Sequence, residues 1–135
     1  MLNKVVARYA DGRLVKGSTG DFNPARDTFH VLPPEPGAAP LTVALRDLKA
    51  VFFVHDLAGN GGYDERKTFD PAKPPAGRRI EVHFRDGEVL VGTTQGYQPD
   101  RVGFFLVPAD PLANNERCFI LSSAVRKVAF VNSPG

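Results

Sequence analysis

Short runs of alternating apolar and polar residues recur along this chain, separated by turns that contain glycine and proline. Every second residue is apolar from Val5 to Tyr9 and again from Ile80 to Phe84, which is the period of a half-buried β-strand. An Asp-Gly pair follows each run after one residue, at 11–12 and at 86–87. Because Asp-Gly tolerates the positive φ of a tight hairpin turn, each run predicts the first strand of a β-hairpin.

The two runs belong to a longer internal repeat. At an offset of 75 residues, segment 5–33 aligns without a gap with segment 80–108, and eight of the 29 aligned positions are identical. After two extra residues in the second copy, segment 43–54 aligns with 120–131. A fixed internal period indicates a duplicated structural unit. The identical positions are Asp11/Asp86, Gly12/Gly87, Gly17/Gly92, Thr19/Thr94, Pro24/Pro99, Arg26/Arg101, Phe29/Phe104 and Pro33/Pro108.

Each copy predicts further strands after its hairpin turn. The second strand, 14–19 or 89–94, carries a glycine in its middle, where a strand commonly bulges or bends so that a small sheet can curl. A polar, proline-marked loop follows, and the alternation then resumes in two more strands. These third and fourth strands are expected at 29–31 and 41–45 in the first copy, and at 104–106 and 118–122 in the second.

The apolar spacing widens near the end of each copy. Apolar residues stand three apart at Leu48 and Val51 and at Val125 and Val128 before the spacing returns to two. This change predicts one short helical turn that leads into a fifth strand. Five such strands fit a small β-barrel of the Sm-like or SH3-like kind.

The predicted fold class is therefore all-β, with two tandem five-stranded small β-barrels related by internal duplication. We expect the first barrel at residues 1–54 and the second at 78–135. Residues 55–77 are rich in glycine and proline and show little alternation, so they are expected to form a linker.

Composition limits the class of protein further. With 42% hydrophobic residues among 135, the chain can form a packed core. It has no run of about 20 apolar residues and no apolar block near its N-terminus, so we expect a soluble, cytoplasmic protein without membrane contact. The lone Cys118 excludes an internal disulfide. The net charge of +2 comes from interleaved basic and acidic residues, which does not favour nucleic acid as the partner.

Both copies carry a pattern that resembles the first sequence motif of Sm-like proteins. The pattern is an alternating strand that ends in an aromatic, then Asp-Gly, two hydrophobic residues and a glycine, as in 5–17 and 80–92. The whole chain also resembles an uncharacterised family of small bacterial proteins with tandem copies of this module. The Sm-like base pocket does not carry over, because Arg26 and Asp27 stand where that family has Met-Asn, and no Arg-Gly pair follows Leu48 or Val125.

Catalytic and metal-binding patterns are missing from the sequence. His30, His55 and His83 do not share a spacing that would chelate a metal, and no serine lies in a G-x-S-x-G elbow. We therefore expect no enzyme activity, no metal and no cofactor.

The favoured function is a non-catalytic adaptor that binds a protein partner through barrel loops or strand edges. The apolar segments 51–54 and 128–131 could pair edge to edge, within the chain or in a homodimer. Within them, the preferred interpretation of Val51, Phe53, Val128 and Phe130 is ordinary core packing. For Phe52 the outward strand face predicts contact with the other barrel or with a partner. Loop and linker positions supply the other candidates. The candidate partner-binding residues are Phe22, Arg26, Phe52, Tyr63, Tyr97 and Arg101.

The alternative function is RNA binding by an Sm-like protein through a non-standard basic surface. Phe22 or Tyr97 would then stack on bases. The phosphate contacts would come from Arg8, Arg13, Lys16, Arg78, Arg79, Arg126 and Lys127.

Overall fold

Ten β-strands and two single turns of 3-10 helix form the computed structural model, which describes residues 2–57, 78–98, 100–109 and 115–130. The all-β class is confirmed. No helix in these segments is long and apolar enough to cross a membrane. The first half comprises β1 (Asn3–Tyr9), β2 (Leu14–Thr19), β3 (Thr28–Val31), β4 (Leu41–Ala44), η1 (Leu45–Asp47) and β5 (Leu48–Val54). The second half comprises β6 (Arg78–Phe84), β7 (Val89–Thr94), β8 (Gly103–Pro108), β9 (Asn115–Leu121), η2 (Ser122–Ala124) and β10 (Val125–Phe130).

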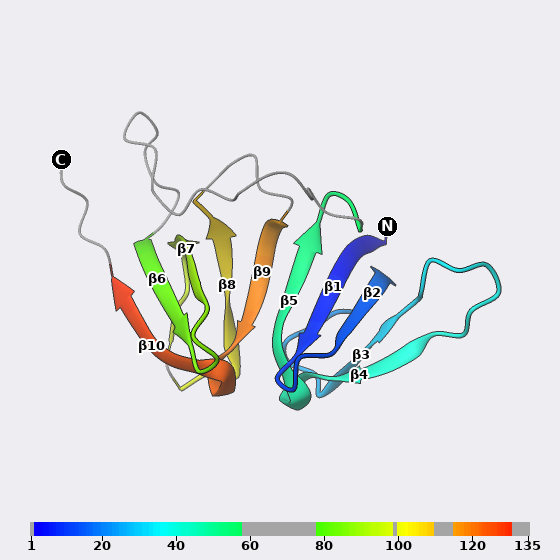
Figure 1. Cartoon of the computed structure of the whole chain (residues 1–135), viewed down its shortest axis with the longest axis horizontal. Helices are drawn as coiled ribbons and strands as arrows, with labels where there is room; N and C mark the ends of the chain where they lie inside the picture. Colours follow the sequence, from blue (N-terminus) through cyan, green and yellow to red (C-terminus); the bar gives the residue numbers. More distant parts are fainter. Residues whose placement is uncertain (1, 58–77, 99, 110–114, 131–135) are drawn as a thin grey trace.

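Eight of the strands form one antiparallel sheet in the order β10-β6-β7-β8-β9-β5-β1-β2 (Figure 1). β3 and β4 form a separate two-stranded sheet, and an isolated bridge between Ser18 and Leu32 joins β3 to β2. The strands of each half therefore lie side by side in the same spatial order. The fifth strand of the half comes first, followed by its first, second, third and fourth strands. This shared order agrees with the internal repeat.

The halves do not form two separate closed barrels in this structure. β5, the last strand of the first half, pairs with β9, the fourth strand of the second, with Val51 opposite Phe119 and Phe52 opposite Cys118. Within the described residues, no ladder joins β4 to β5 or β9 to β10. The physical reason lies in β5, whose seven residues are all buried. A strand that is buried on both faces needs packing partners on two sides, and the second half supplies one of them.

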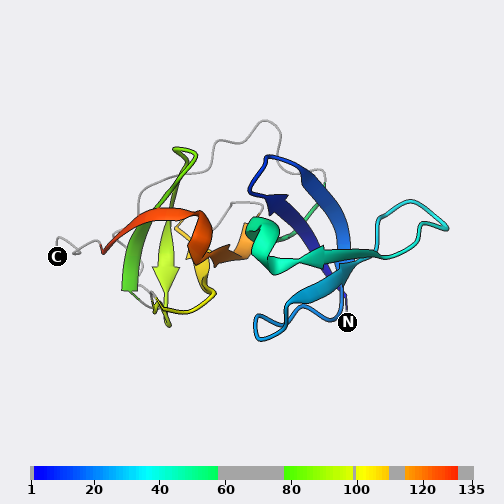
Figure 2. The ribbon, with the colours of Figure 1, turned by 90° about the horizontal axis from the view of Figure 1, so that it is seen from below.

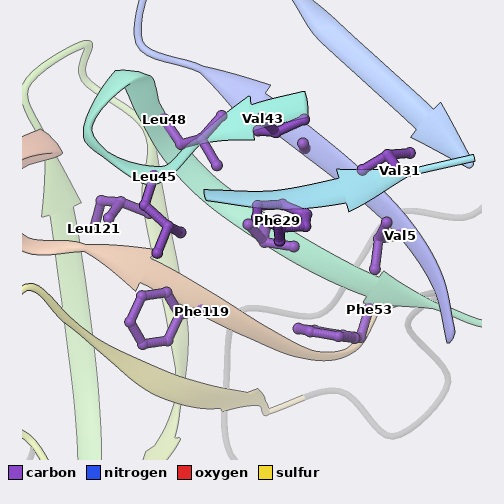
Figure 3. Close-up of a cluster of buried hydrophobic side chains, with 11 residues drawn as sticks. Val5, Phe29, Val31, Val43, Leu45, Leu48, Phe53, Phe119 and Leu121 are labelled. Carbon is purple, nitrogen blue, oxygen red and sulfur yellow. The ribbon is translucent and has the colours of Figure 1, made fainter. Parts of the chain in front are cut away.

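The two hydrophobic cores consequently share their central strands. Val51 and Phe53 of β5 point into the first core, where Phe119 and Leu121 of β9 join them (Figure 3). The alternate residues of both strands point into the second core. That second set is Ala50, Phe52 and Val54 of β5 with Cys118 and Ile120 of β9. Each half thus completes its core with side chains from the other.

Glycines have the roles expected of the hairpins and the curled strands. Gly12 and Gly87 have φ of +97° and +96° in the two Asp-Gly turns, a region that glycine enters without steric cost. A Cβ added to Gly92 would lie 2.1 Å from the carbonyl oxygen of Val107. This glycine therefore lets β7 and β8 cross closely.

One short 3-10 turn precedes the last strand of each half, as predicted, but η1 and η2 lie three residues earlier than the apolar spacing indicated. The spacing of three instead reflects a β-bulge at the start of each last strand. Tyr9 pairs with Leu48 while Arg8 pairs with Ala50, so Lys49 is the extra residue of β5. The second half repeats this feature, with Arg126 as the extra residue between Val125 and Lys127. Such bulges turn a side chain in a new direction.

Candidate functional site

A groove of about 570 Å³ lies at the junction of the two halves, at the end of the molecule where η1 and η2 lie close together (Figure 2). The loop between β2 and β3 and the turn η1 form its walls. The second half contributes Val102, whose side chain is 51% exposed. The lining residues are Pro24, Ala25, Arg26, Asp27, Thr28, Ala44, Leu45, Arg46 and Val102.

Backbone hydrogen bonds hold the walls of this groove together. The Leu45 amide donates to the Asp27 carbonyl at 2.9 Å, which ties η1 to the β2–β3 loop. Within the loop, the Arg26 amide donates to the Asn23 carbonyl at 3.0 Å, and the Ala25 amide donates to Asn23 Oδ1 at 2.9 Å. An asparagine that bonds its own backbone two residues on stabilises a turn. The loop thereby has a defined shape without a ligand.

The groove combines apolar and cationic chemistry. Ala25 and Val102 offer exposed apolar surface, while Leu45 is buried beneath it. The exposed side chains of Arg26 and Arg46 add two guanidinium groups. A guanidinium can bind a carboxylate with two parallel hydrogen bonds. The groove is thus suited to a ligand that carries an apolar side chain next to an acidic one, although Asp27 limits the positive charge.

Phe22, a predicted partner-binding residue, lies in an aromatic cluster that spans the junction. Its ring centroid is 5.0 Å from that of Phe29, 5.4 Å from Phe53 and 5.5 Å from Phe119, all in edge-to-face geometry. Such aromatic contacts stabilise packing. The half-buried ring therefore supports the groove loop from behind.

The equivalent residues of the second half form a different surface. Tyr97 packs edge to face on Phe104 at 4.8 Å and on Phe130 at 5.7 Å. Arg101 donates from Nε to Gln98 Oε1 at 2.7 Å, so it braces its own loop. The structure thus does not bring Arg26 and Arg101, which are equivalent in the repeat, into one groove: only Arg26 lines the junction.

A basic and aromatic surface surrounds Tyr97. A shallow depression of about 200 Å³ brings Tyr97 together with Arg126 and Lys127. Beside it, the guanidinium of Arg78 lies 3.7 Å from the ring centroid of Phe130. Three cationic side chains and two aromatic rings therefore gather at the β10 end of the sheet.

Lys49 links the two halves electrostatically. The bulge turns its side chain, which is only 8% exposed, toward the β6–β7 hairpin, where Nζ donates to Asp86 Oδ2 at 2.7 Å and also to Glu88. Arg8 lies 3.6 Å from Glu88 and adds a second cation. The hydrogen bond from Lys49 is the largest cause that lowers the pKa of Asp86, followed by the Glu88 amide. This cluster is a bridge between halves, and its lysine already has two partners.

Phe52 and Tyr63 complete the set of predicted residues. Phe52 is buried in the second core, and the guanidinium of Arg8 lies 5.7 Å from its ring centroid. It therefore contacts the other half and is not displayed to a partner. Tyr63 falls outside the described residues.

Histidine side chains pair with carboxylates in the described part of the chain. Among the described residues, no group of three or more His, Cys, Asp or Glu side chains is placed to hold a metal ion. His30 Nδ1 lies 2.6 Å from Asp21 Oδ2 on the exposed face of the first half. The hydrogen bond from His30 is the main cause that lowers the pKa of Asp21.

Several residues at these sites escaped the sequence-based prediction. Arg46 and Val102 were not candidates because they lie far from Arg26 along the chain and meet it only after folding. Phe130 was expected in the core, but it is 39% exposed and packs on Tyr97. Lys49 had a usable signal, since the same apolar spacing of three marks the bulge that turns its side chain.

The chain matches a known protein family over nearly its whole length. Residues 1–132 match a family of unknown function (DUF6982). No curated protein and no solved structure matches the chain. Because the match covers nearly the whole chain, the chain belongs to this family.

Proposed function

We propose that this member of the DUF6982 family is a non-catalytic interaction module that binds a protein partner in the groove between its halves. The observation that carries the proposal is the composition of the groove, where Arg26 and Arg46 occur together with exposed apolar surface from Ala25 and Val102. An extended peptide segment with one apolar residue beside an aspartate or glutamate satisfies both kinds of surface. Phe22 supports this site through packing and does not contact the ligand.

A display library of random peptides tests this proposal directly. The expected result is enrichment of peptides that carry an apolar residue next to an acidic one. Val102→Asp should abolish their binding, and the pair Arg26→Ala with Arg46→Ala should weaken it about tenfold or more, because charge-assisted hydrogen bonds are lost. Arg101→Ala is the matched control, since it removes an exposed arginine of the equivalent loop. Binding that is insensitive to the groove variants would contradict the proposal.

The proposed architecture behind this function is a duplicated Sm-like unit, in which the two barrels of a tandem repeat have fused through one shared interface. The identical strand order of the halves supports this reading. The sequence resemblance also favours a bacterial module, for which we propose a cytoplasmic location.

RNA binding is a second candidate function, favoured by the surface around Tyr97. There an aromatic ring lies among Arg78, Arg126 and Lys127, the combination that single-stranded nucleic acids require. A fluorescently labelled single-stranded RNA should then bind at low salt, lose affinity steeply as salt rises, and bind Tyr97→Ala several-fold more weakly. Unchanged affinity in Tyr97→Ala would exclude this surface as the RNA site.

A further inference from the structure

Four strands lie at the ends of the two sheets in the described part of the chain, and two of these, β2 and β3, approach each other at the Ser18–Leu32 bridge. The outer edges of β10 and β4 remain open. β10 pairs only with β6, and β4 pairs only with β3. In the repeat, β10 is the equivalent of β5 and β4 is the equivalent of β9, the two strands that pair with each other inside the molecule. The same chain thus presents an open copy of each partner in its internal interface.

We propose that β10 of one molecule pairs with β4 of a second copy of this chain, repeating the antiparallel β5–β9 contact between molecules. Each open edge is thus covered by another copy of the chain, and the copies are joined head to tail through β10 and β4. Such a heterologous contact uses two different surfaces and extends into a ring or a filament. The contact uses the open edge of β4, whose last residue, Ala44, also lines the groove at the junction.

The repeat fixes the register of this contact. Phe52 of β5 is opposite Cys118 of β9. In the repeat, their equivalents are Ala129 of β10 and Leu41 of β4, so these two residues should lie opposite each other between molecules. Inside the molecule, the large Phe52 of β5 faces the small Cys118 of β9. Between molecules, the small Ala129 of β10 would face the large Leu41 of β4. Leu41 is 43% exposed, and pairing would cover it. The same sizes disfavour pairing of β5 with β4 in place of β10, because two large side chains, Phe52 and Leu41, would then face each other.

Charges at the open edges repeat the internal bridge as well. The bulge residue Lys49 binds Asp86 of the neighbouring hairpin. The equivalent bulge residue is Arg126, and the equivalent hairpin residue is Asp11. Both are exposed and available to the second copy, although Asp11 also pairs with Arg13 of its own turn.

Two residues weaken the contact between molecules relative to the internal one. Pro40 precedes β4 and cannot donate to a ladder. Lys127 of β10 stands where β5 has the fully buried Ala50. Lysine and proline commonly blunt strand edges against unlimited pairing. The assembly is therefore reversible and depends on protein concentration.

Engineered cysteines test the register. Full-length Leu41→Cys and full-length Ala129→Cys are mixed and oxidised, because directly opposed positions in an antiparallel pair lie close enough for a disulfide. The expected result is a covalent dimer in the mixture and none with either variant alone. Dimers of one variant alone would overturn the head-to-tail contact, and so would a mixture that yields no dimer although both variants retain the wild-type circular dichroism spectrum.

Sedimentation velocity tests the assembly without engineered cysteines. The weight-average mass should rise with concentration, and Arg126→Glu should raise the dissociation constant about fivefold or more. Lys4→Glu is the matched control, since it makes the same charge change on a strand inside the sheet and should leave the mass distribution unaltered. A wild-type protein that stays monomeric at its solubility limit, or an equal effect of both substitutions, would overturn the proposal.

Discussion

Phe52 of the first half lies directly opposite Cys118 of the second, and both side chains are buried in the core of the second half. The neighbouring pair, Val51 and Phe119, points the other way into the core of the first half. The β5–β9 ladder therefore joins the two cores back to back. This relationship makes the stability of each half depend on the other.

Truncation of Phe52 should destabilise both halves together. Phe52→Ala is expected to lower the free energy of unfolding by about 3–4 kcal/mol, because it leaves a cavity in the second core. Chemical denaturation followed by circular dichroism should still show one cooperative transition for the whole chain. The exposed Leu14→Ala, on an edge of the large sheet, should cost less than about 1 kcal/mol. Two separate transitions in wild type would contradict the shared core.

The thiol of Cys118 should report the opening of the β5–β9 ladder. Because Cys118 is 1% exposed, an aromatic disulfide reagent should react with it only after the ladder opens. When the labelling rate follows the opening equilibrium, Phe52→Ala should accelerate the reaction by a factor of about 100. This factor corresponds to a loss of roughly 3 kcal/mol in the free energy of opening. Rapid labelling of the native wild type would show that the ladder is not closed in solution.

The Lys49 bridge should make the junction sensitive to acid. The pKa of Asp86 is lower in the folded chain than its ordinary value, chiefly because Lys49 donates to it. The stabilisation is therefore present above the unfolded pKa of about 3.9 and is lost as pH falls through the lower folded pKa. Asp86→Asn keeps the acceptor for the Glu88 amide but removes the charge.

We expect Asp86→Asn to cost about 0.5 kcal/mol at neutral pH, a small value because the carboxylate is 54% exposed. The difference from wild type should shrink as the pH falls below about 4. Urea denaturation at a series of pH values measures it. A difference that stays constant into strong acid would show that Asp86 acts without its charge.

Glycine at position 92 is required by the close crossing of β7 and β8. Gly92→Ala is expected to destabilise the fold by more than about 2 kcal/mol, since the new Cβ would collide with the Val107 carbonyl oxygen at 2.1 Å. Gly96→Ala is a matched control, because a Cβ there meets nothing within 4 Å. Thermal unfolding of the two variants measures the contrast, and equal melting temperatures would argue against the close approach.

Local sequence signals predicted the elements of this fold well. Alternation located strands on both sides of the Asp-Gly turns, and glycine marked the hairpin turns through its freedom at positive φ. The helical turns were misplaced, because a bulge at Lys49 produces the same apolar spacing of three as a helical turn. The groove was only partly predictable: Arg26 was identified from the repeat, whereas Val102 joins it through a tertiary contact.

By itself, the sequence determined that this protein is all-β, that it repeats one strand order, and where its Asp-Gly hairpin turns lie. These features depend on the side-chain period and on backbone freedom at single residues, both of which are local properties. Only the tertiary structure decided that β5, which pairs with β1 of its own half, also pairs with β9 of the other half. Strand pairing joins residues far apart in the chain, and a strand that is apolar on both faces can be buried in more than one arrangement.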